Sequence, residues 1–355
     1  MEKDLTKRLF VRGNEAICLG ALEAGCRHYF GYPITPQNDI PEFMSREIPK
    51  LNGEFIQAES EVAAINMVLG AAATGVRAMT SSSSPGISLK MESVSYMAAM
   101  EVPCLIVNIS RSGPGLGGID ASQGDYFQAV KGGGHGGYHI IVLAPASIQE
   151  MYDLTMLAFD LAEEYRSPAM ILGDAVVGQM KEPLAPRPKP DTELTEKNWA
   201  LRGTGEGEQR VIKSLYLGDG ELEARNWKLH AKYSLMKEKE CRWEESHTDD
   251  AKILVTAFGS AARIAKTAVA MARDEGMKVG FLRPITLFPF PEKAFRDATL
   301  RCKKVLDIEL NTGQMVEDVR LSVARDADVF FYGRPSGTGS LPTPEELFAQ
   351  IKKYY

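Results

Sequence analysis

Two carboxylates stand where a short apolar strand gives way to a helix of small residues. Glu59 and Glu61 follow the apolar pair Phe55 and Ile56 and precede residues 62–73, which carry no charged side chain. A helix that is apolar on all sides is expected to be buried, and one this thin would let a backbone or a flat ligand approach. Open α/β sheets bind ligands at the carboxyl ends of their strands, where these acids fall.

Glu61 allows two interpretations. An acidic side chain in the first turn of a helix commonly complements the helix dipole, and position alone favours this structural role. The alternative is a carboxylate held against apolar surroundings so that it can manage a proton. The spacing leaves both interpretations open.

Three further loops follow strands and carry groups able to bind a ligand. Residues 31–36 present Thr35 between two prolines, although a structural turn is the commoner use of such a sequence. Residues 80–86, TSSSSPG, place hydroxyls and backbone N–H groups at a helix start, which suits an anion, while one serine also serves as a cap. Arg111, at a strand end before a glycine-rich loop, suits bidentate binding of a carboxylate, with surface ion pairing as the alternative.

Composition narrows the class of protein. The 355 residues are 44% hydrophobic and 25% charged, which is typical of a globular chain of two or three domains. There is no apolar run of about 18 residues, and the charged N-terminus lacks the apolar centre of a secretory signal. The net charge of −6 gives no footprint for nucleic acid. We expect a soluble cytoplasmic protein with neither a membrane nor a nucleic-acid partner.

No metal site is expected in this chain. The five cysteines are scattered without a C-x-x-C pair, so they are expected to be buried thiols and cannot hold an iron–sulfur cluster. The five histidines lack metal-ligand spacing. The fragment at residues 218–220, GDG, has no strand before it and no asparagine at the distance that a diphosphate–metal motif requires.

The order of elements predicts an α/β fold of two parallel-sheet, three-layer domains. Residues 1–178 alternate expected strands at 28–32, 55–56, 77–81, 104–109, 140–143 and 169–172 with helices at 14–25, 37–46, 62–73, 87–100 and 147–164. Residues 179–250, with prolines at 183, 186, 188 and 190, suggest a linker and excursion with one helix at 226–239. Residues 251–355 predict strands at 253–257, 278–282, 304–308 and 328–332, and helices at 260–274, 314–324 and after Thr343.

Several long motifs resemble, in the same order, those of 2-oxoacid:ferredoxin oxidoreductases. They are GYPITPQNDIPE, FIQAESEVAAINMVLGAAATG, TSSSSPGISLKMES, NISRSGPGLGG with SQGDYFQA, and LRPITLFPFP with ELNTGQM. The similarity is to the subunit with the thiamine-diphosphate pyrimidine-binding domain and a transketolase-C-like domain. It covers nearly the whole chain and is weakest at residues 181–250.

The resemblance implies roles for individual residues. Glu61 would hydrogen-bond the aminopyrimidine ring of thiamine diphosphate and so promote removal of the thiazolium proton. Thr35 and Arg111 fall where the family holds the 2-oxo-carboxylate of the substrate. The remaining expected cofactor contacts are Pro33, Ile34 and Ser83.

The resemblance also implies partners. Another subunit would hold the diphosphate with Mg²⁺, a ferredoxin-like subunit would hold iron–sulfur clusters, and the active site would lie between chains. The reaction would convert a 2-oxoacid, coenzyme A (CoA) and oxidised ferredoxin into acyl-CoA, CO₂ and reduced ferredoxin. A branched-chain substrate such as 2-oxoisovalerate is favoured, because no basic residue in these loops besides Arg111 could hold a second carboxylate. The alternatives are a 2-oxoglutarate- or pyruvate-specific member, a non-catalytic scaffold, and a transketolase-like or lipoyl-linked enzyme without ferredoxin.

Overall fold

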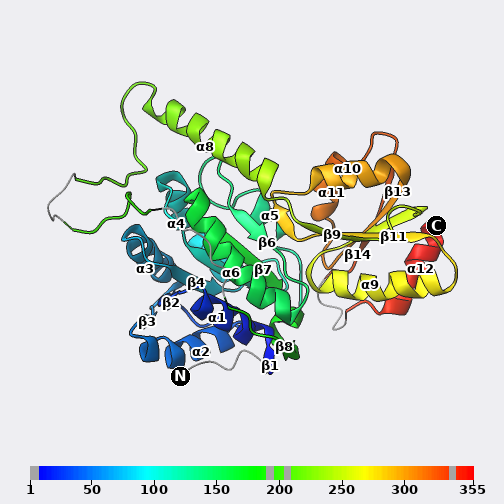
Figure 1. The fold of residues 1–355 in the computed structure, drawn as a ribbon, viewed down its shortest axis with the longest axis horizontal. Coiled ribbons are helices and arrows are strands. Elements are labelled where there is room, and N and C mark those ends of the chain that lie inside the picture. Colours follow the sequence, from blue (N-terminus) through cyan, green and yellow to red (C-terminus); the bar gives the residue numbers. More distant parts are fainter. Residues whose placement is uncertain (1–7, 189–195, 204–208, 336–340) are drawn as a thin grey trace.

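Short apolar runs separated by helical segments form the first sheet. This computed structural model describes residues 8–188, 196–203, 209–335 and 341–355 (Figure 1). The strands of the first sheet are β2 (His28–Gly31), β3 (Glu54–Gln57), β4 (Ala78–Ser82), β5 (Leu105–Ser110), β6 (Ile141–Leu143), β7 (Ala169–Asp174) and β12 (Thr286–Phe288). Their spatial order is β12-β6-β7-β5-β4-β2-β3, and only the β12–β6 pair is antiparallel. The inner strands β4, β5 and β7 are buried along their whole length, as parallel strands covered on both faces require.

Helices cover both faces of the first sheet. They are α1 (Gly13–Glu23), α2 (Asp39–Glu47), α3 (Glu61–Ala73), α4 (Ser84–Met100), α5 (Tyr126–Val130), α6 (Ile148–Tyr165) and α7 (Ala175–Gln179), with a 3-10 turn η1 (Pro49–Leu51). Helix α1 packs on α2 and α6, and α3 packs on α4. A two-stranded ribbon, β1 (Leu9–Arg12) with β8 (Lys181–Leu184), closes the first domain.

The second sheet is smaller. Its strands are β9 (Trp243–Ser246), β10 (Ile253–Thr256), β11 (Val279–Pro284), β13 (Lys304–Glu309) and β14 (Asp328–Gly333), in the spatial order β14-β13-β10-β11-β9. Its helices are α9 (Gly259–Asp274), α10 (Glu292–Arg301), α11 (Met315–Ser322) and α12 (Pro344–Tyr354), and α8 (Glu221–Lys239) lies over the first domain (Figure 1). Helices α9 and α12 lie on one face of this sheet and α10 and α11 on the other (Figure 1). The predicted fold class, α/β with two three-layer parallel sheets, is confirmed.

The elements that the sequence did not predict are short or depend on a distant partner. They are β1, β8, β9, β12, α5, α7 and α10. Strand β9, WEES, lies within the expected excursion 179–250 yet joins the second sheet, and β12 lies within 251–355 yet joins the first. The division into domains at 1–178, 179–250 and 251–355 stays a prediction. Strands β9 and β12 do not follow it, because each joins a sheet formed mainly by another segment. Residues 1–7 lie outside the described residues, and the interpretation of the N-terminus rests partly on them. Pro190, one of the prolines of the expected linker, also lies outside them.

The expectation that the helix at 62–73 is buried on all sides is wrong for this chain. Val62 is 44% exposed, and Asn66 and Gly70, one and two turns further along α3, are also exposed. The reason is position, because α3 follows the edge strand β3, and its main packing among the described elements is against α4, β2 and β4. Helix α4 likewise exposes Leu89 (53%) and Tyr96. We call these five residues of the two helices the α3–α4 surface.

The cysteines lie in the surroundings that the sequence predicts. All five cysteines are free, and four are buried, which confirms their interpretation as buried thiols. Burial raises the pKa of Cys26 and of Cys104 to about 12, so these thiols stay protonated at neutral pH.

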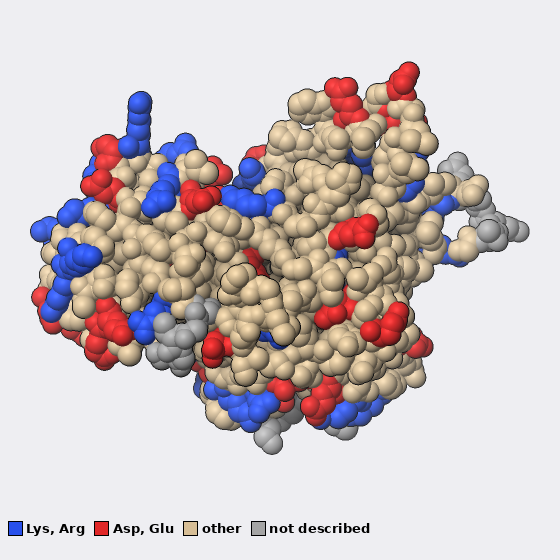
Figure 2. Space-filling view, turned by 180° about the vertical axis from the view of Figure 1, so that it is seen from behind, with Lys and Arg blue, Asp and Glu red and all other residues tan. Residues whose placement is uncertain are grey.

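On the face in Figure 2, basic and acidic residues lie near one another around a broad uncharged area. No helix in the described part of the chain is long and apolar enough to cross a membrane.

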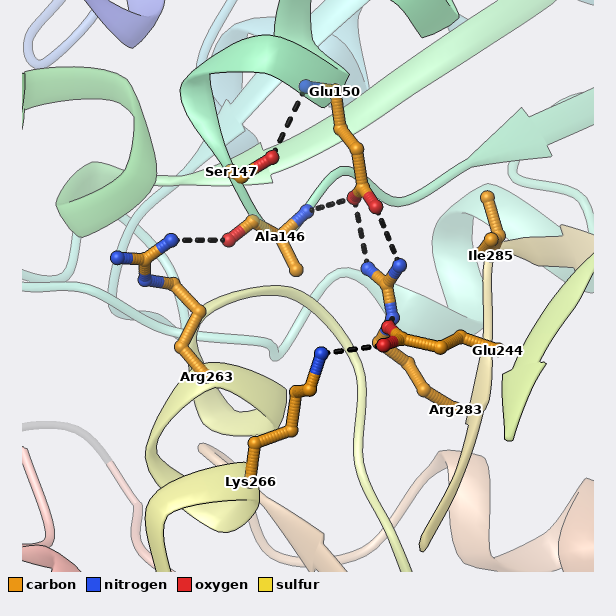
Figure 3. Close-up of a pocket in the computed structure, with 8 residues that line it drawn as sticks. All are labelled: Ala146, Ser147, Glu150, Glu244, Arg263, Lys266, Arg283 and Ile285. Atoms are coloured by element: carbon orange, nitrogen blue, oxygen red, sulfur yellow. Dashed lines mark hydrogen bonds and ion pairs between the residues drawn. The ribbon is translucent and has the colours of Figure 1, made fainter. Parts of the chain in front are cut away.

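Arg283 joins the two domains. Its side chain is almost fully buried at the end of β11, and it donates two hydrogen bonds to Glu150 of α6, at 2.9 and 2.6 Å. Its Nε lies 3.0 Å from Glu244 of β9. These residues line a cavity of about 420 Å³ between the domains (Figure 3). Burial alone would raise the pKa of Glu150, but the bonds and charge of Arg283 outweigh it and lower that pKa.

We predict that Arg283→Met destabilises the protein by about 2–4 kcal/mol, because it removes the cation paired with the partly buried Glu150 and one cation from Glu244, which keeps Lys266. The matched control is Arg46→Met, which removes the solvent-exposed pair with Glu42 and is expected to cost about 0–0.5 kcal/mol. Chemical denaturation of both variants measures the difference. Equal losses in the two variants would contradict a domain junction based on Arg283.

Candidate functional site

Glu61 lies at the carboxyl end of the first sheet, as the first residue of α3. The helix begins here because Ser60 is its N-cap and accepts a hydrogen bond from the backbone N–H of Ala63 at 3.2 Å. Glu61 is only 6% exposed, whereas Glu59 points to solvent. Glu61 is therefore both a first-turn acid and a largely desolvated carboxylate, so the two sequence interpretations describe the same residue.

Gly86 of α4 makes room for this carboxylate. A Cβ atom at Gly86 would lie 2.6 Å from Oε1 of Glu61 and 2.1 Å from the hydroxyl oxygen of Ser82. Real Cβ atoms do not approach so closely, so only glycine fits between the two helices. The hydroxyls of Ser82 and Ser83 are fully buried and have no hydrogen-bond partner among the described residues. The Ser82 hydroxyl, which shares the space around Gly86 with Glu61, is thus a buried polar group that the described residues leave unsatisfied.

Lys90 is a site residue that the sequence reasoning missed. It lies one turn after Gly86 on α4, is fully buried, and donates a hydrogen bond to the Thr80 hydroxyl at 2.9 Å. Burial lowers the pKa of Lys90 to about 8, and the charge of Glu61 acts against this shift. The sequence did contain a signal, since Lys90 lies four residues after a glycine on a helix that has no other cation. The methionines of the same helix suggested only core packing, so Lys90 was not considered.

The loop of residues 33–36 is held rigidly beside this centre. The Thr35–Pro36 peptide is cis, and the Pro36 carbonyl accepts hydrogen bonds from Asn14 at 3.1 Å and Gln179 at 2.6 Å. Pro33 and Thr35 are exposed and Ile34 is half-buried. Three of the residues predicted to bind cofactor or substrate therefore lie on one fixed, accessible turn.

Arg111 connects that turn to the glycine-rich loop. Its guanidinium donates to the carbonyl of Thr35 at 2.9 Å and to the carbonyl of Leu116 at 3.1 Å. Its Nε is buried with no partner among the described residues. The structure thus brings Arg111 and Thr35 together, and the buried Nε donor of Arg111 stays uncommitted.

A second network, also missed from the sequence, fixes the start of α4. Ser84 donates to Asp125 at 2.6 Å and accepts from the backbone N–H of Arg111 at 2.9 Å, and Asn108 donates to Asp125 at 2.8 Å. Burial raises the pKa of Asp125 above its usual value despite these bonds. The helix starts at Ser84, three residues before the expected residue 87, because this network holds Ser84, the last residue of the serine run, in the first turn.

The arrangement fits one edge of a planar, nitrogen-containing ring. The buried carboxylate of Glu61 can accept or share a ring proton, the unsatisfied hydroxyls of Ser82 and Ser83 can bond polar substituents, and Arg111 can bind a carboxylate nearby. Among the described residues, no group of three or more His, Cys, Asp or Glu side chains could hold a metal ion.

Comparison with known proteins places this site within a family. Residues 19–240 match the family model "Pyruvate flavodoxin/ferredoxin oxidoreductase, thiamine diP-bdg", and residues 251–347 match "Pyruvate:ferredoxin oxidoreductase core domain II". The ketoisovalerate oxidoreductase subunit VorB of Methanothermobacter thermautotrophicus is 50% identical over 325 residues, which are 90% of this chain and 91% of the relative. The 2-oxoglutarate synthase subunit KorA of the same organism is 37% identical, over 98% of this chain and 99% of the relative.

Solved structures agree on the fold. A 2-oxoglutarate:ferredoxin oxidoreductase from Magnetococcus marinus, with 2-oxoglutarate, coenzyme A and succinyl-CoA bound, superposes with a TM-score of 0.90 at 26% identity. The alignment covers 98% of this chain but 65% of that longer chain. A split-gene transketolase, described as an inactive beta4 tetramer, shares the fold with a TM-score of 0.58 at 12% identity.

We predict that Gly86→Ala destabilises the protein by about 1–3 kcal/mol, because its methyl group would displace Glu61 or Ser82. The control is Gly70→Ala in α3, where an added Cβ would meet nothing within 4 Å. That change is expected to stabilise by about 0.5–1 kcal/mol. Urea denaturation compares the two variants. If Gly86→Ala were as stable as Gly70→Ala, the close approach of Gly86 to Glu61 would be wrong.

We predict that Lys90→Met alters the pH dependence of stability. Since the folded-state pKa of about 8 lies below the ordinary lysine value of 10.5, the unfolded state binds the extra proton between these values, and stability rises with pH across this window. Lys90→Met should remove that rise and be more stable than the wild type at neutral pH, with the gap closing towards pH 10.5. Thermal denaturation at several pH values measures this effect. The control is Lys50→Met, at an exposed lysine, and parallel curves for Lys90→Met and the wild type would refute the prediction.

Proposed function

Because this chain belongs to the 2-oxoacid:ferredoxin oxidoreductase family, we propose that it is the pyrimidine-activating subunit of a branched-chain member. The proposed reaction is the oxidative decarboxylation of a 2-oxoacid such as 2-oxoisovalerate, with CoA and oxidised ferredoxin as co-reactants. The products are acyl-CoA, CO₂ and reduced ferredoxin. Members of this family are oxidoreductases that work with partner subunits. A location in the cytoplasm forms part of the same proposal.

The observation that carries the proposal is the buried Glu61 carboxylate beside Gly86 and two unsatisfied serine hydroxyls. A carboxylate at the rim of a desolvated space binds a ring proton more strongly than one in water. Thiamine diphosphate, when bound, supplies the nucleophilic carbon and the electron sink. Glu61 would hold the pyrimidine ring and manage its proton, while Pro33, Ile34 and Ser83 would contact the ring.

Arg111 and Thr35 would position the substrate. The uncommitted Nε of Arg111 and the exposed Thr35 both lie at the turn that Arg111 holds. Arg111 has five N–H donors and its two carbonyl bonds use two of them, so Nε–H and a second N–H could bind a carboxylate while both carbonyl partners are kept. The bond to the Leu116 carbonyl would then hold the guanidinium against the glycine-rich loop while substrate is bound.

A partner subunit would complete the site. The α3–α4 surface exposes Val62, Leu89 and Tyr96 beside the helix that carries Glu61, and exposed apolar groups of this kind mark protein interfaces. We place the diphosphate and Mg²⁺ on the subunit that covers this surface. The iron–sulfur clusters would lie on a ferredoxin-like subunit, since the cysteines of this chain are scattered.

The choice of substrate rests on similarity and charge. The ketoisovalerate oxidoreductase subunit is 50% identical, whereas the 2-oxoglutarate synthase subunit is 37% identical. Arg111 can bind one carboxylate, and the 2-oxoglutarate substrate has two. Because the 2-oxoglutarate relative matches 98% of the chain, 2-oxoglutarate is the second candidate.

We predict that Glu61→Gln lowers turnover of the assembled complex by about 100-fold or more while the subunits still assemble, because the amide cannot manage the ring proton. The matched control is Glu59→Gln, at an exposed carboxylate two residues away, which should keep wild-type turnover. The assay follows CoA-dependent viologen reduction with 2-oxoisovalerate, 2-oxoglutarate and pyruvate.

Near-normal turnover by Glu61→Gln would remove Glu61 from the mechanism and support a scaffold role. A higher kcat/KM for 2-oxoglutarate or pyruvate than for 2-oxoisovalerate would overturn the substrate choice alone. A purified active complex without iron–sulfur absorption would favour an enzyme that does not use ferredoxin.

A further inference from the structure

A second cavity, separate from the site of Glu61, lies near the opposite ends of the strands of the first sheet, at the C-terminal end of α4. Its volume is about 380 Å³, which falls in the range of small-molecule pockets. It is lined at the C-terminal end of α4 by Glu101, and Ser84, at the other end of that helix, belongs to the network beside Glu61. The 17 residues of α4 separate the two regions by about 25 Å, since a helix rises about 1.5 Å per residue.

The cavity gathers cations from three separate segments. The charged side chains that line it are five basic residues and one acid: Arg166, Arg210, Lys213, Arg225, Lys228 and Glu101. Helix α8 supplies two of the five, and it crosses over this end of the first domain (Figure 1). Segments this far apart in sequence are brought together by the fold alone.

Glu101, the one acid that lines the cavity, already accepts hydrogen bonds from three cationic side chains. Glu101 accepts from Arg225 and Lys228 at 2.7 Å each and from the nearby Lys232 at 3.3 Å. Burial alone would raise the pKa of Glu101, but the Lys228 hydrogen bond and the charges of Lys232 and Arg225 outweigh it and lower that pKa to about 2. Glu101 is therefore ionised at neutral pH and balances one of these three positive charges.

Arg166 and Arg210 have no carboxylate partner among the described residues. Arg166 donates to the backbone carbonyl of Glu101 at 3.2 Å, and Arg210 donates to the carbonyl of Ala200 at 2.7 Å. Carbonyl groups satisfy some of the donors but do not neutralise the charges. Lys213 is only 3.7 Å from Glu221, in a pair that solvent screens. The cavity thus carries an excess of positive charge.

The crowding of these cations has an energetic cost. Burial lowers the pKa of Lys232 to about 8, and Arg225 and Lys228 lower it further against the pull of Glu101. The pKa of Arg166 is also lowered, by burial and by Arg225. A polyvalent anion in the cavity would relieve this repulsion, because each cation would then have a counter-charge in a partly desolvated space.

Two aromatic rings complete the lining. The guanidinium carbon of Arg166 lies 4.7 Å from the centre of the Trp199 ring, and the Lys213 ammonium lies 4.8 Å from the centre of the Tyr216 ring. These cation–π contacts hold two of the cations against flat apolar surfaces. A ligand with phosphate groups would find its counter-charges fixed, and a planar base attached to it would find rings on which to stack.

We propose that this basic cavity binds a small phosphate-bearing anion of the pyrophosphate or nucleoside-diphosphate class, at a site separate from the Glu61 centre. Phosphate oxygens accept the forked donors of arginine bidentately, which suits Arg166 and Arg210 in particular. The shared chemistry is the diphosphate group, and its source is either inorganic pyrophosphate or a nucleotide.

Isothermal titration of the assembled complex with pyrophosphate and with ADP tests the proposal. One binding site per copy of this chain is expected, with an affinity that falls as salt is raised. The double variant Arg210→Gln/Lys213→Gln, which leaves the bonds to Glu101 intact, should weaken binding at least about tenfold, since it removes two counter-charges. Arg187→Gln, at an exposed arginine paired with Asp153 outside this cavity, is the matched control and should bind like the wild type.

Each outcome is decisive. Tighter binding of ADP than of pyrophosphate assigns the site to a nucleotide that stacks on the rings, and equal binding assigns it to the diphosphate group alone. Failure of both probes to bind, or equal binding by the double variant and the wild type, overturns the proposal. Loss of a subunit from the double-variant complex together with no probe binding would instead identify the cavity as contact with an acidic partner protein. Viologen-reduction activity, measured in parallel, reports on the Glu61 centre independently.

Discussion

The structure depends on keeping an ionisable carboxylate largely out of water at the start of a helix. Glu61 can lie there because Ser60 caps α3 and Gly86 leaves the space that a larger residue would fill. The buried Lys90 side chain, whose only hydrogen bond within the described chain goes to the Thr80 hydroxyl, is costly by itself. Its position facing Glu61 gives a functional reason for that cost.

The rest of the site is organised around this constraint. Arg111 ties the turn that carries Thr35 to the glycine-rich loop, and Asp125 ties that loop to the start of α4. Gln123, next to it, bonds the backbone of the second domain at Phe258 and Leu310, so the loop is anchored on both domains. The second domain thereby contributes to the position of the loop that carries Leu116 and, through Arg111, to the substrate-binding end of the site.

Two accessible regions of the chain differ in their chemistry. The α3–α4 surface keeps apolar side chains in solvent next to Glu61, which fits a family in which subunits work together. Near the opposite ends of the strands, α8 and the segment before it form a basic cavity around Glu101. The same α/β framework therefore presents two chemically different surfaces, one at each end of its strands.

The sequence by itself determined the fold class, most inner strands and helices, the free thiols and the family, because local apolar runs, caps such as Thr343 and long motifs are properties of contiguous residues. It also proposed Glu61, Thr35 and Arg111 as site residues, but did not predict the bond that joins the last two across 76 residues. Lys90, Asp125 and the cation cluster around Glu101 were decided only by the tertiary structure. Burial and pairing of charges depend on which distant segments meet, and no local pattern records that. For the same reason the exposed side of α3 was mistaken for buried, since the sequence shows an apolar helix but not that its strand lies at the edge of the sheet.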